Sequence, residues 1–394
     1  MAVSQSPRDP AFVQSPWAFY DRVRATGPLF DWVEYGFPCA AGHAEVGALL
    51  RDRRFGREAP PGLLPEPPEH LRPFYAIEAH SMLEREPPAH TRLRALVSRA
   101  FVSRRISRLE PEIAALSTQL IEGFSGDRID LLPAWCARIP VIVICRLLGV
   151  PEEMADQLLS WSHDMVAMYQ ARRDRAVEER AAAAATEFAA FIRGYIARRR
   201  RSPGEDLISV LIAAEEAGDR LSTDELVTTC ILLLNAGHEA TVHAFGNGVK
   251  AVLESGLETQ ALFATPERAI DTVEEILRFD PPLHLFTRYA LEEVEIYGRR
   301  FAIGDKVGLL LGAAGRDPAA YEDPHDFRPG RDGPLHHAFG AGIHFCVGAP
   351  LARLELRVAL ADLFRRLPTL RLDGRPVYAD RYHFRGLETL PVTA

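Results

Sequence analysis

The stretch 339–360, "FGAGIHFCVGAPLARLELRVAL", places three glycines around one cysteine and then continues as a helical pattern. Gly340, Gly342 and Gly348 flank Cys346. Glycines at this density let the backbone approach a flat molecule closely. They also leave the backbone amides free to point at the sulfur of Cys346. The start of the following helix adds partial positive charge, which favours the thiolate form of Cys346. A thiolate surrounded by hydrogen-bond donors is a suitable ligand for iron.

Three other interpretations of Cys346 stay open. A free cysteine is most often simply buried, although burial leaves the flanking glycines unexplained. A zinc ion would find His336, His337 and His344 nearby, but a closed zinc site needs four ligands and no second cysteine is within reach. A cysteine–histidine nucleophile is the third, although the glycines and the long helix match no protease signature.

A second stretch, "LLLNAGHEATVHAFGNGV" (232–249), places polar residues inside an apolar helix. Ser222, followed three residues later by Glu225, forms a capping-box pattern that predicts where this helix begins. A helix from there to about Ser255 is roughly 50 Å long, and residues 226–236 are apolar on nearly every face. This buried central helix carries four residues that break the pattern: Gly237, His238, Glu239 and Thr241.

The rest of the chain gives coarser structural predictions. The proline-rich segment 57–73 predicts an irregular loop, and helical patterning dominates from His90 to about Ser255. The arginine run at 198–201 indicates the solvated end of a helix. Short strands are expected within 292–313, where Gly298 and Gly304 supply turns.

The pattern F-G-x-G-x-H-x-C-x-G, read from Phe339 to Gly348, resembles the cysteine-ligand loop of the cytochrome P-450 haem-thiolate monooxygenases. Glu275 and Arg278 match the family's E-x-x-R pair, whose members share a helix face and can form a structural ion pair. Similarity covers most of the chain. It implies a single cytochrome P-450 domain over residues 1–394, of the soluble bacterial type, mainly α-helical with a small β-rich lobe.

The resemblance also implies a b-type haem and the residues that hold it. Cys346 is the expected protein ligand to the haem iron. Small residues of the long helix and the cysteine loop are expected beside the haem: Ala236, Gly237, Phe339, Gly340 and Gly348. The side chains expected at the haem propionates are His90, Arg94, Arg288 and His344. His90 and Arg94 share a helical face, for which a solvated surface is the alternative.

Glu239 and Thr241 are the expected catalytic residues, and at this point the sequence departs from the family. The family's hydroxyl residue follows the acid directly, whereas Ala240 follows Glu239, and Thr241 comes about 100° further round an ideal helix. Glu239 is expected to relay protons for O–O cleavage. Water or the substrate is expected to supply the missing hydroxyl, with Thr241 on a π-bulged helix as the alternative. His238 is expected to be a satisfied helix histidine.

Several residues are expected to contact the substrate. Asn235 either hydrogen-bonds the substrate or bonds a neighbouring helix. The helix face that should look at the haem contains Leu232, Asn235, Ala236 and Ala240. By resemblance the pocket also includes segments 57–88 and 283–287, with Leu283 and Phe286, and the stretch before Phe384. Their composition predicts a mostly apolar guest.

The expected reaction inserts one atom of O₂ into a small, mostly apolar organic substrate, by hydroxylation or epoxidation, with electrons from NAD(P)H. The chain has no GxGxxG motif and no iron–sulfur cysteine spacing, so a separate ferredoxin or flavodoxin is expected to deliver them. A peroxide-driven peroxygenase and a non-catalytic haem-thiolate sensor are the alternatives. A basic patch is expected to receive the ferredoxin, with a scattered solvated face as the alternative: Arg99, Arg104, Arg105, Arg353 and Arg357.

Composition excludes other classes of protein. The net charge of −8 argues against a nucleic-acid partner. The first residues show no signal-peptide pattern, and the apolar stretches fall short of the roughly 18 residues that a spanning helix needs, so a cytoplasmic monomer with no membrane partner is expected. Five cysteines without CxxC spacing indicate reduced thiols.

Overall fold

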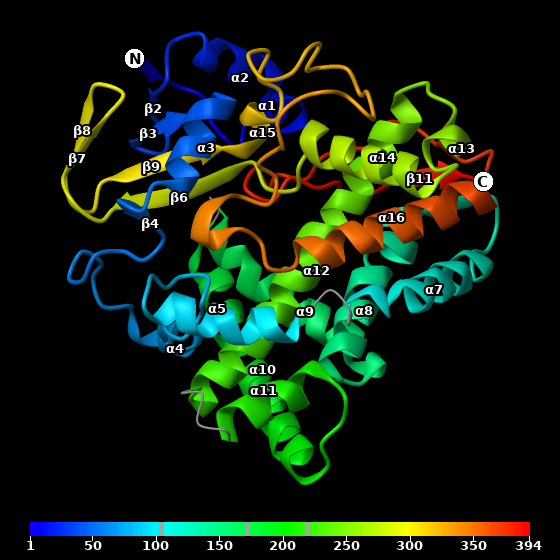
Figure 1. Cartoon of the computed structure of the whole chain (residues 1–394), viewed down its shortest axis with the longest axis horizontal. Coiled ribbons are helices and arrows are strands. Elements are labelled where there is room, and N and C mark those ends of the chain that lie inside the picture. Colours follow the sequence, from blue (N-terminus) through cyan, green and yellow to red (C-terminus); the bar gives the residue numbers. More distant parts are fainter. Residues whose placement is uncertain (102–105, 171–172, 217–220) are drawn as a thin grey trace. The chain divides into compact units, whose positions relative to one another are not determined.

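The computed structural model of this chain describes residues 1–101, 106–170, 173–216 and 221–394 (Figure 1). Its contacts divide it into two compact units. Unit 1 comprises Met1–Leu63, Glu110–Ala137 and Ala240–Ala394, and unit 2 comprises Leu64–Leu109 and Arg138–Glu239. All strands among the described residues belong to unit 1, whereas unit 2 is helical. The prediction of a mainly α-helical fold with a small β-rich part is confirmed.

A six-stranded sheet forms part of unit 1, with strand order β1-β2-β3-β9-β6-β4. Its strands are β1 (Ala2–Val3), β2 (Phe30–Trp32), β3 (Phe37–Ala40), β4 (Phe55–Gly56), β6 (Leu285–Ala290) and β9 (Lys306–Leu310). Strand β9 pairs in parallel with β3 and antiparallel with β6. It reads KVGLL and is buried apart from its first residue, because both of its faces are covered.

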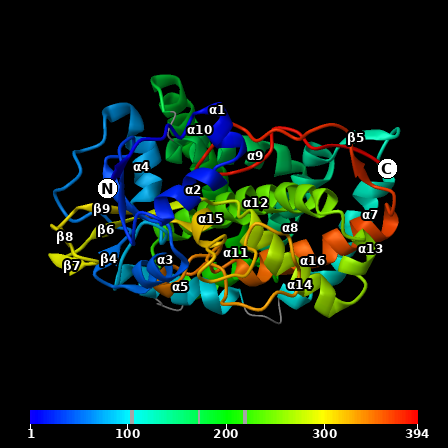
Figure 2. The same ribbon diagram turned by 90° about the horizontal axis from the view of Figure 1, so that it is seen from above.

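Two hydrophobic clusters pack against this sheet. Helix α3 (His43–Arg51) lies beside β9, as Figures 1 and 2 show, and its Val46 shares a cluster with Leu309. The second cluster holds Phe19 and Trp32 together with Leu285 of β6. Burial of these side chains fixes β6, which carries two predicted site residues, in the middle of packed apolar residues.

Two smaller sheets complete the strands of unit 1. One has the order β10-β11-β5, and the other is a hairpin of β7 and β8. Their bounds are β5 (Arg128–Asp130), β7 (Val294–Ile296), β8 (Arg299–Phe301), β10 (Arg371–Leu372) and β11 (Pro391–Thr393). Gly298 and Gly304 have φ values of +71° and +89°, which glycine adopts without steric cost. Both predicted turns are therefore confirmed.

The long helix α16 of unit 1 contacts α7, α13 and α14. Besides α3, the described helices that lie wholly in unit 1 are α1 (Pro10–Gln14), α2 (Trp17–Arg24), α7 (Glu110–Glu122), η2 (Leu132–Cys136), α13 (Thr259–Leu262), α14 (Pro266–Phe279), α15 (Leu311–Ala314), η5 (Gly342–His344) and α16 (Ala349–Arg366). Helix α14 begins where Thr265 accepts a hydrogen bond from the Arg268 amide at 3.3 Å, with Pro266 in the first turn.

The helices of unit 2 are η1 (Glu69–Leu71), α4 (Arg72–Glu78), α5 (Ala89–Ala100), α8 (Arg138–Leu148), η3 (Glu152–Met154), α9 (Ala155–Val166), η4 (Ala167–Tyr169), α10 (Arg175–Arg201) and α11 (Leu207–Glu216). Helix α10 packs along α9 and α4, and its buried positions include four alanines, which allow close approach. Its cap is Asp174, which accepts from the Val177 amide at 2.9 Å. The arginine run closes α10 just before Ser202, as predicted.

Helix α12 (Thr223–Glu254) runs through the boundary between the two units, at Glu239 and Ala240. Its predicted capping box is confirmed, since the Glu225 amide donates to Ser222 Oγ at 3.2 Å and the Ser222 amide donates to the Glu225 carboxylate at 2.8 Å. All 32 of its residues are α-helical. The helix therefore contains no π-bulge that would rotate Thr241.

The prediction of a loop over residues 57–73 was wrong at its end. Residues 69–71 form a 3₁₀ turn, and α4 begins at Arg72. Pro73 stands in the first turn of α4, where a missing amide hydrogen breaks no intrahelical bond, so this proline starts a helix instead of extending the loop.

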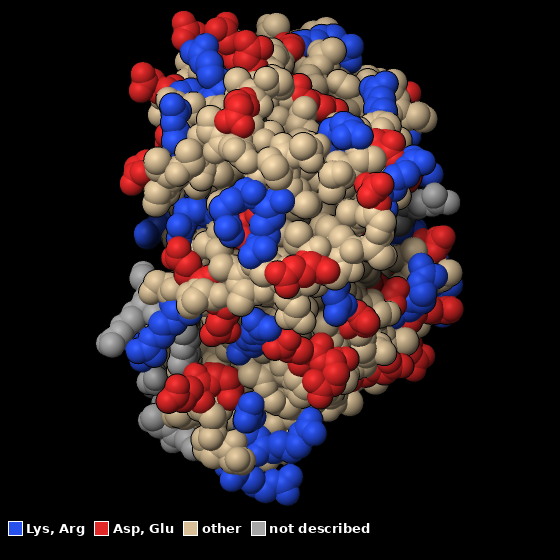
Figure 3. Space-filling view, turned by 90° about the vertical axis from the view of Figure 1, so that its right-hand side faces the viewer, with Lys and Arg blue, Asp and Glu red and all other residues tan. Residues whose placement is uncertain are grey.

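Two properties of the described residues bear on possible partners. None of the helices in the described part of the chain is both long and apolar enough to span a bilayer. Acidic and basic side chains are interspersed on the face drawn in Figure 3, as expected for a chain with 46 basic and 54 acidic residues.

Candidate functional site

Two glycine turns shape the loop that precedes α16. Gly340 and Gly342 both have φ of +70°, a left-handed conformation that side chains rarely adopt. A Cβ at Gly342 would lie 2.5 Å from the Leu50 carbonyl oxygen, so the backbone approaches the end of α3 more closely than any other residue allows. The Cys346 amide donates to the Phe339 carbonyl at 3.0 Å and closes the loop.

Cys346 is exposed, whereas the other four cysteines are buried: Cys39, Cys136, Cys145 and Cys230. Burial raises the pKa of Cys145 and Cys230 to about 12. It raises the pKa of Cys39 and Cys136 as well. These four remain neutral thiols near pH 7, and a neutral thiol is a poor metal ligand. Among the cysteines of the chain, Cys346 alone combines exposure with a glycine-rich loop.

The sulfur of Cys346 lies next to the N-terminus of α16. Gly348 is the N-cap residue of this helix, and a Cβ built there would lie 3.8 Å from Cys346 Sγ. The Ala349 amide donates to the Cys346 carbonyl at 3.4 Å. Because the amides of a helix N-terminus carry partial positive charge, this position favours a thiolate.

Strand β6, the segments near it and the cysteine loop hold further predicted site residues of unit 1. Arg288 is only 2% exposed, and its guanidinium lies 5.9 Å from the centre of the Phe286 ring. Leu283 pairs with Phe384 through an isolated bridge, which brings two of the predicted pocket segments together. His344 lies in η5, within the cysteine loop.

In unit 2, helix α5 holds His90 and Arg94 one turn apart. His90 is only 2% exposed, so a solvated helix face does not explain it. Arg92 of the same helix donates to Glu225 at 3.2 Å and ties α5 to the start of α12. Helix α5, which carries His90 and Arg94, is therefore held in place by packing and by the ion pair of Arg92 with Glu225.

The predicted haem-facing stripe of α12 is its least covered side. Ala236 is exposed, and Leu232, Asn235 and Ala240 are partly buried, while most other positions of the helix are buried. The side-chain amide of Asn235 lies 3.7 Å from the sulfur of Met165 on α9. That contact matches the structural alternative for Asn235, in which it bonds a neighbouring helix.

Gly237 has a packing role inside unit 2. A Cβ at this position would lie 3.0 Å from Cγ1 of Ile144 on α8. The glycine therefore lets α8 and α12 approach each other, and the exposed small side chain on this part of α12 is that of Ala236.

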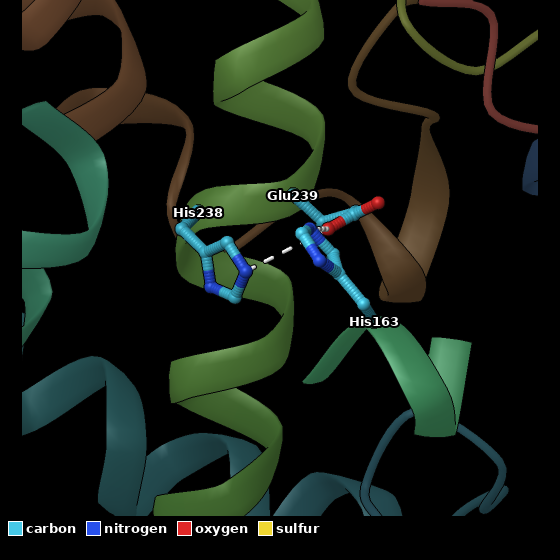
Figure 4. Close-up of side chains that lie close together, drawn as sticks. All are labelled: His163, His238 and Glu239. Carbon is cyan, nitrogen blue, oxygen red and sulfur yellow. Dashed lines mark ion pairs between the residues drawn. The ribbon is translucent and has the colours of Figure 1, made fainter. Parts of the chain in front are cut away.

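Glu239 belongs to a polar cluster that also contains His238 and His163 (Figure 4). Its carboxylate is buried, 3.2 Å from His163 Nε2 and 3.6 Å from His238 Nε2. His238 Nδ1 donates to the Leu234 carbonyl at 2.7 Å, which agrees with the prediction of a helix histidine bonded within its own helix for this one ring nitrogen. Thr241 is buried. Nothing in the sequence predicted His163, which approaches from α9.

The predicted ion pair of Glu275 and Arg278 is present and buried, each residue being 3% exposed. Arg278 donates two hydrogen bonds to the Glu275 carboxylate, at 2.7 and 2.8 Å. A third member, Arg331, donates to the same carboxylate at 3.0 Å. It lies 56 residues further along the chain, where no spacing rule could have found it.

Comparison with known proteins decides the family. The cytochrome P450 family model matches residues 270–375. The biotin biosynthesis cytochrome P450 of Bacillus subtilis (strain 168) is 34% identical over 397 residues, covering all of both chains. The 6-deoxyerythronolide B hydroxylase of Saccharopolyspora erythraea is 38% identical over 390 residues, covering 95% of this chain and 94% of that protein. The chain belongs to the cytochrome P450 family.

Solved structures of cytochrome P450 proteins agree. The structure of P450BioI in complex with a hexadec-9Z-enoic acid ligated acyl carrier protein has a TM-score of 0.91 and 34% identity, covering 97% of this chain and 99% of that chain. The structure of CalO2 has a TM-score of 0.90 and 32% identity, covering 99% of this chain and 98% of that chain. This P450 is accordingly an oxidoreductase, a haem-thiolate monooxygenase that uses haem b and O₂ and takes electrons from NAD(P)H through redox partners.

The structure gives little support to the predicted basic patch of this P450. Arg104 and Arg105 lie outside the described residues. Arg353 donates to Glu274 at 2.6 Å, and Arg357 donates to Glu110 at 2.9 Å. Two of the three described members are thus already neutralised by a carboxylate.

Proposed function

We propose that Cys346 is the protein ligand to the haem iron of this monooxygenase. The observation that carries the proposal is the contrast among the five cysteines: Cys346 is exposed beside a helix N-terminus, and the others are buried with raised pKa values. Phe339, Gly340 and Gly348 then shape the backbone behind the sulfur. The donor chemistry fits a haem iron, which takes a thiolate ligand in this family of enzymes.

The haem propionates are proposed to be held by four side chains: His90, Arg94, Arg288 and His344. The burial of Arg288 and His90 supports this assignment. The propionates of haem b supply two carboxylates, which can accept charge-assisted hydrogen bonds from a guanidinium or an imidazolium. Ala236, small and exposed on α12, is proposed to be the closest helix residue to the ring.

Glu239 is proposed to move protons for the reaction. When bound, the haem supplies the iron at which O₂ is reduced, and its thiolate ligand favours O–O cleavage. The Glu239 carboxylate is buried, and it lies 3.2 Å from His163, whose side chain is 54% exposed. A proton can therefore pass from solvent to the imidazole and from Nε2 to a carboxylate oxygen, which is the geometry required of a proton-transfer pair.

The hydroxyl that accompanies the acid is proposed to come from water or from the substrate. Thr241 is buried in an unbroken α-helix, and Ala240 occupies the partly covered stripe. The methyl side chain of an alanine on that stripe can neither donate nor accept a hydrogen bond. This P450 therefore depends on a group that is not part of its own chain.

The substrate is proposed to be a small, mostly apolar organic molecule that is hydroxylated or epoxidised. Leu232, Ala240, Leu283 and Phe286 are the proposed apolar contacts. Asn235 is the proposed polar contact through its carbonyl oxygen, since its amide nitrogen already contacts Met165. Relatives support this class: one is a 6-deoxyerythronolide B hydroxylase, and another binds a carrier protein that holds hexadec-9-enoic acid. A ferredoxin or flavodoxin is proposed as the electron donor. The monomeric state and the cytoplasmic location stay predictions.

Reconstitution with a ferredoxin, its reductase and NADPH tests this function. Substrates are first selected by the absorption shift that follows loss of the iron-bound water, and products are then identified by mass spectrometry. We expect a product that carries one oxygen atom from isotopically labelled O₂. Product formed only with hydrogen peroxide would indicate a peroxygenase instead. Ligand binding without consumption of NADPH for any ligand would indicate a sensor.

A further inference from the structure

Three potential metal ligands converge in unit 2, at the polar cluster of His163, His238 and Glu239 (Figure 4). Their ligand atoms all lie within 4.8 Å of one another, and this is the one such group found among the described residues. His163 comes from α9, and the other two come from consecutive positions of α12. Two rigid helices thus hold the cluster.

Two of the three ligand spacings match a tetrahedral zinc site, and the third is at most 4.8 Å. Zinc binds imidazole nitrogen and carboxylate oxygen at about 2.0–2.2 Å, so two ligand atoms of a tetrahedron lie about 3.3–3.6 Å apart. The carboxylate of Glu239 lies 3.2 Å from His163 Nε2 and 3.6 Å from His238 Nε2. Small rotations of the side chains would bring both distances to the ideal edge.

The imidazole of His238 is already oriented for coordination. A carbonyl oxygen only accepts hydrogen bonds, so the 2.7 Å contact with Leu234 places the proton of the neutral ring on Nδ1. Nε2 then carries the lone pair, and it faces Glu239. A backbone carbonyl that holds the second ring nitrogen is the usual support of a metal-binding histidine.

The cluster also has an entry path. Glu239 and His238 are buried, whereas the side chain of His163 is 54% exposed. An ion can bind His163 first and then draw in the two buried ligands. Correct ligand types, suitable spacing, a supporting hydrogen bond and access from solvent are the features required of a metal site.

We propose that His163, His238 and Glu239 form a binding site for zinc, or for a divalent ion of similar preference, that inhibits this P450. Two neutral imidazoles and one carboxylate are a common zinc set, and they leave a fourth position for water. The inhibition rests on the proposed role of Glu239, because a carboxylate bound to zinc no longer exchanges protons with His163. Bound zinc therefore stops proton delivery.

Equilibrium dialysis of the haem-loaded protein against zinc sulfate, followed by metal analysis, tests the binding. We expect one zinc ion per chain, and we expect His163→Asn and His238→Asn each to weaken binding by at least about tenfold. His325→Asn is the matched control. His325 is also half-exposed and also lies 3.2 Å from a carboxylate, that of Asp21, so its loss tests whether a single histidine–carboxylate pair is enough.

Turnover measured at the same zinc concentrations tests the regulation. We expect zinc to inhibit the wild-type protein with the same midpoint as binding. We expect the His238→Asn variant to resist zinc, because His238 is a proposed zinc ligand that takes no part in the proposed relay between His163 and Glu239. Absence of bound zinc, or binding that survives both substitutions, would overturn the site. Zinc bound there without inhibition would overturn the regulation. The monooxygenase function is measured separately, in zinc-free buffer with a chelator present. A negative result for zinc therefore does not contradict that function.

Discussion

Ala240 is the residue at which this P450 departs from its family, because it follows the acid of the long helix without offering a hydroxyl. The neighbouring Thr241 is buried, and its helix is regular. Sequence periodicity was enough to place Ala240 rather than Thr241 on the open stripe, since the 3.6-residue period of an unbroken helix decides it. In the proposed mechanism, the proton-transfer chemistry therefore centres on Glu239.

Substitutions at the two positions should separate their roles. Glu239→Gln keeps the shape of the side chain but cannot exchange a proton, so turnover should fall by about 10²-fold or more. Thr241→Ala should leave the coupling of NAD(P)H consumption to product formation nearly intact. Measuring product and released peroxide together checks both expectations. A large rise in peroxide from Thr241→Ala alone would show that Thr241 is the working hydroxyl.

The buried carboxylate of Glu275 is expected to stabilise unit 1 through its two arginines. Removing one partner of a buried ion pair costs around 3–5 kcal/mol, so Arg278→Ala should yield little folded, haem-loaded protein. Arg328→Ala is the matched control, because that side chain is 47% exposed and its ion pairs at the surface are worth about 1 kcal/mol or less.

Haem content and melting temperature of the two variants check this expectation. Equal values for both would mean that the Glu275 pair acts as a surface contact. The pair itself was predictable, because its members are three residues apart on one helix. Arg331 and His163 were not, because each reaches its carboxylate only after distant segments have packed together.

At the scale of helices and strands, short sequence patterns predicted where helices begin and end. The contacts between helices depend on packing of segments that are distant in the sequence. The capping box at Ser222 and Glu225 is a short-range pattern, and the structure reproduces it. The start of α4 at Arg72 was missed because prolines were read as loop formers, although a proline in a first turn favours a helix. The packing of Gly237 on Ile144 involves two helices and left no signal in the sequence.

Gly237→Ala should destabilise the protein despite the higher helix propensity of alanine. Alanine gains about 1 kcal/mol over glycine in a helix, but the added methyl would meet Ile144 at 3.0 Å, and overpacking costs about 1–3 kcal/mol. Gly194→Ala is the control, since that position of α10 has nothing within 4 Å. Denaturant unfolding should show a loss of about 1 kcal/mol for the first and a small gain for the second. A gain at both would exclude the close contact.

At the scale of the whole molecule, buried histidines should make stability depend on pH. Burial lowers the pKa of His284 to about 4, from an ordinary value near 6.5. Between these values the unfolded chain binds a proton that the folded protein does not, so stability is fully present above pH 6.5 and falls as the pH is lowered. The loss at His284 should be about 1.5 kcal/mol between pH 6.5 and 5.

Denaturant unfolding at several pH values checks this dependence. Glu274 does not contribute above pH 5, because Arg353 and His336 lower its pKa to about 2 despite its burial. Burial raises the pKa of Glu355, which therefore contributes in the same window, so the difference between the wild-type protein and His284→Gln isolates the histidine. His284→Gln should give a flatter profile than the wild-type protein. An identical slope in both would show that His284 is protonated equally in the folded and unfolded chains.

The fold class and the family could be predicted from the sequence, because the cysteine loop and the long helix are continuous segments whose residues act together. The residues proposed to hold the propionates come from α5, β6 and η5, which are widely separated in the sequence. Their grouping followed from resemblance alone. The proposed substrate contacts are common apolar side chains that fit many molecules, so the sequence predicts a class of substrate and not one compound.

The thiolate ligation of iron by Cys346 is tested most directly by the absorption spectrum of the reduced protein under carbon monoxide. The wild-type protein should show the red-shifted Soret band of a thiolate-ligated ferrous–CO complex, and Cys136→Ala, which alters a buried cysteine, should retain it. Cys346→Ser should abolish that band. Its survival in the Cys346→Ser variant would contradict the assignment of Cys346 as the iron ligand.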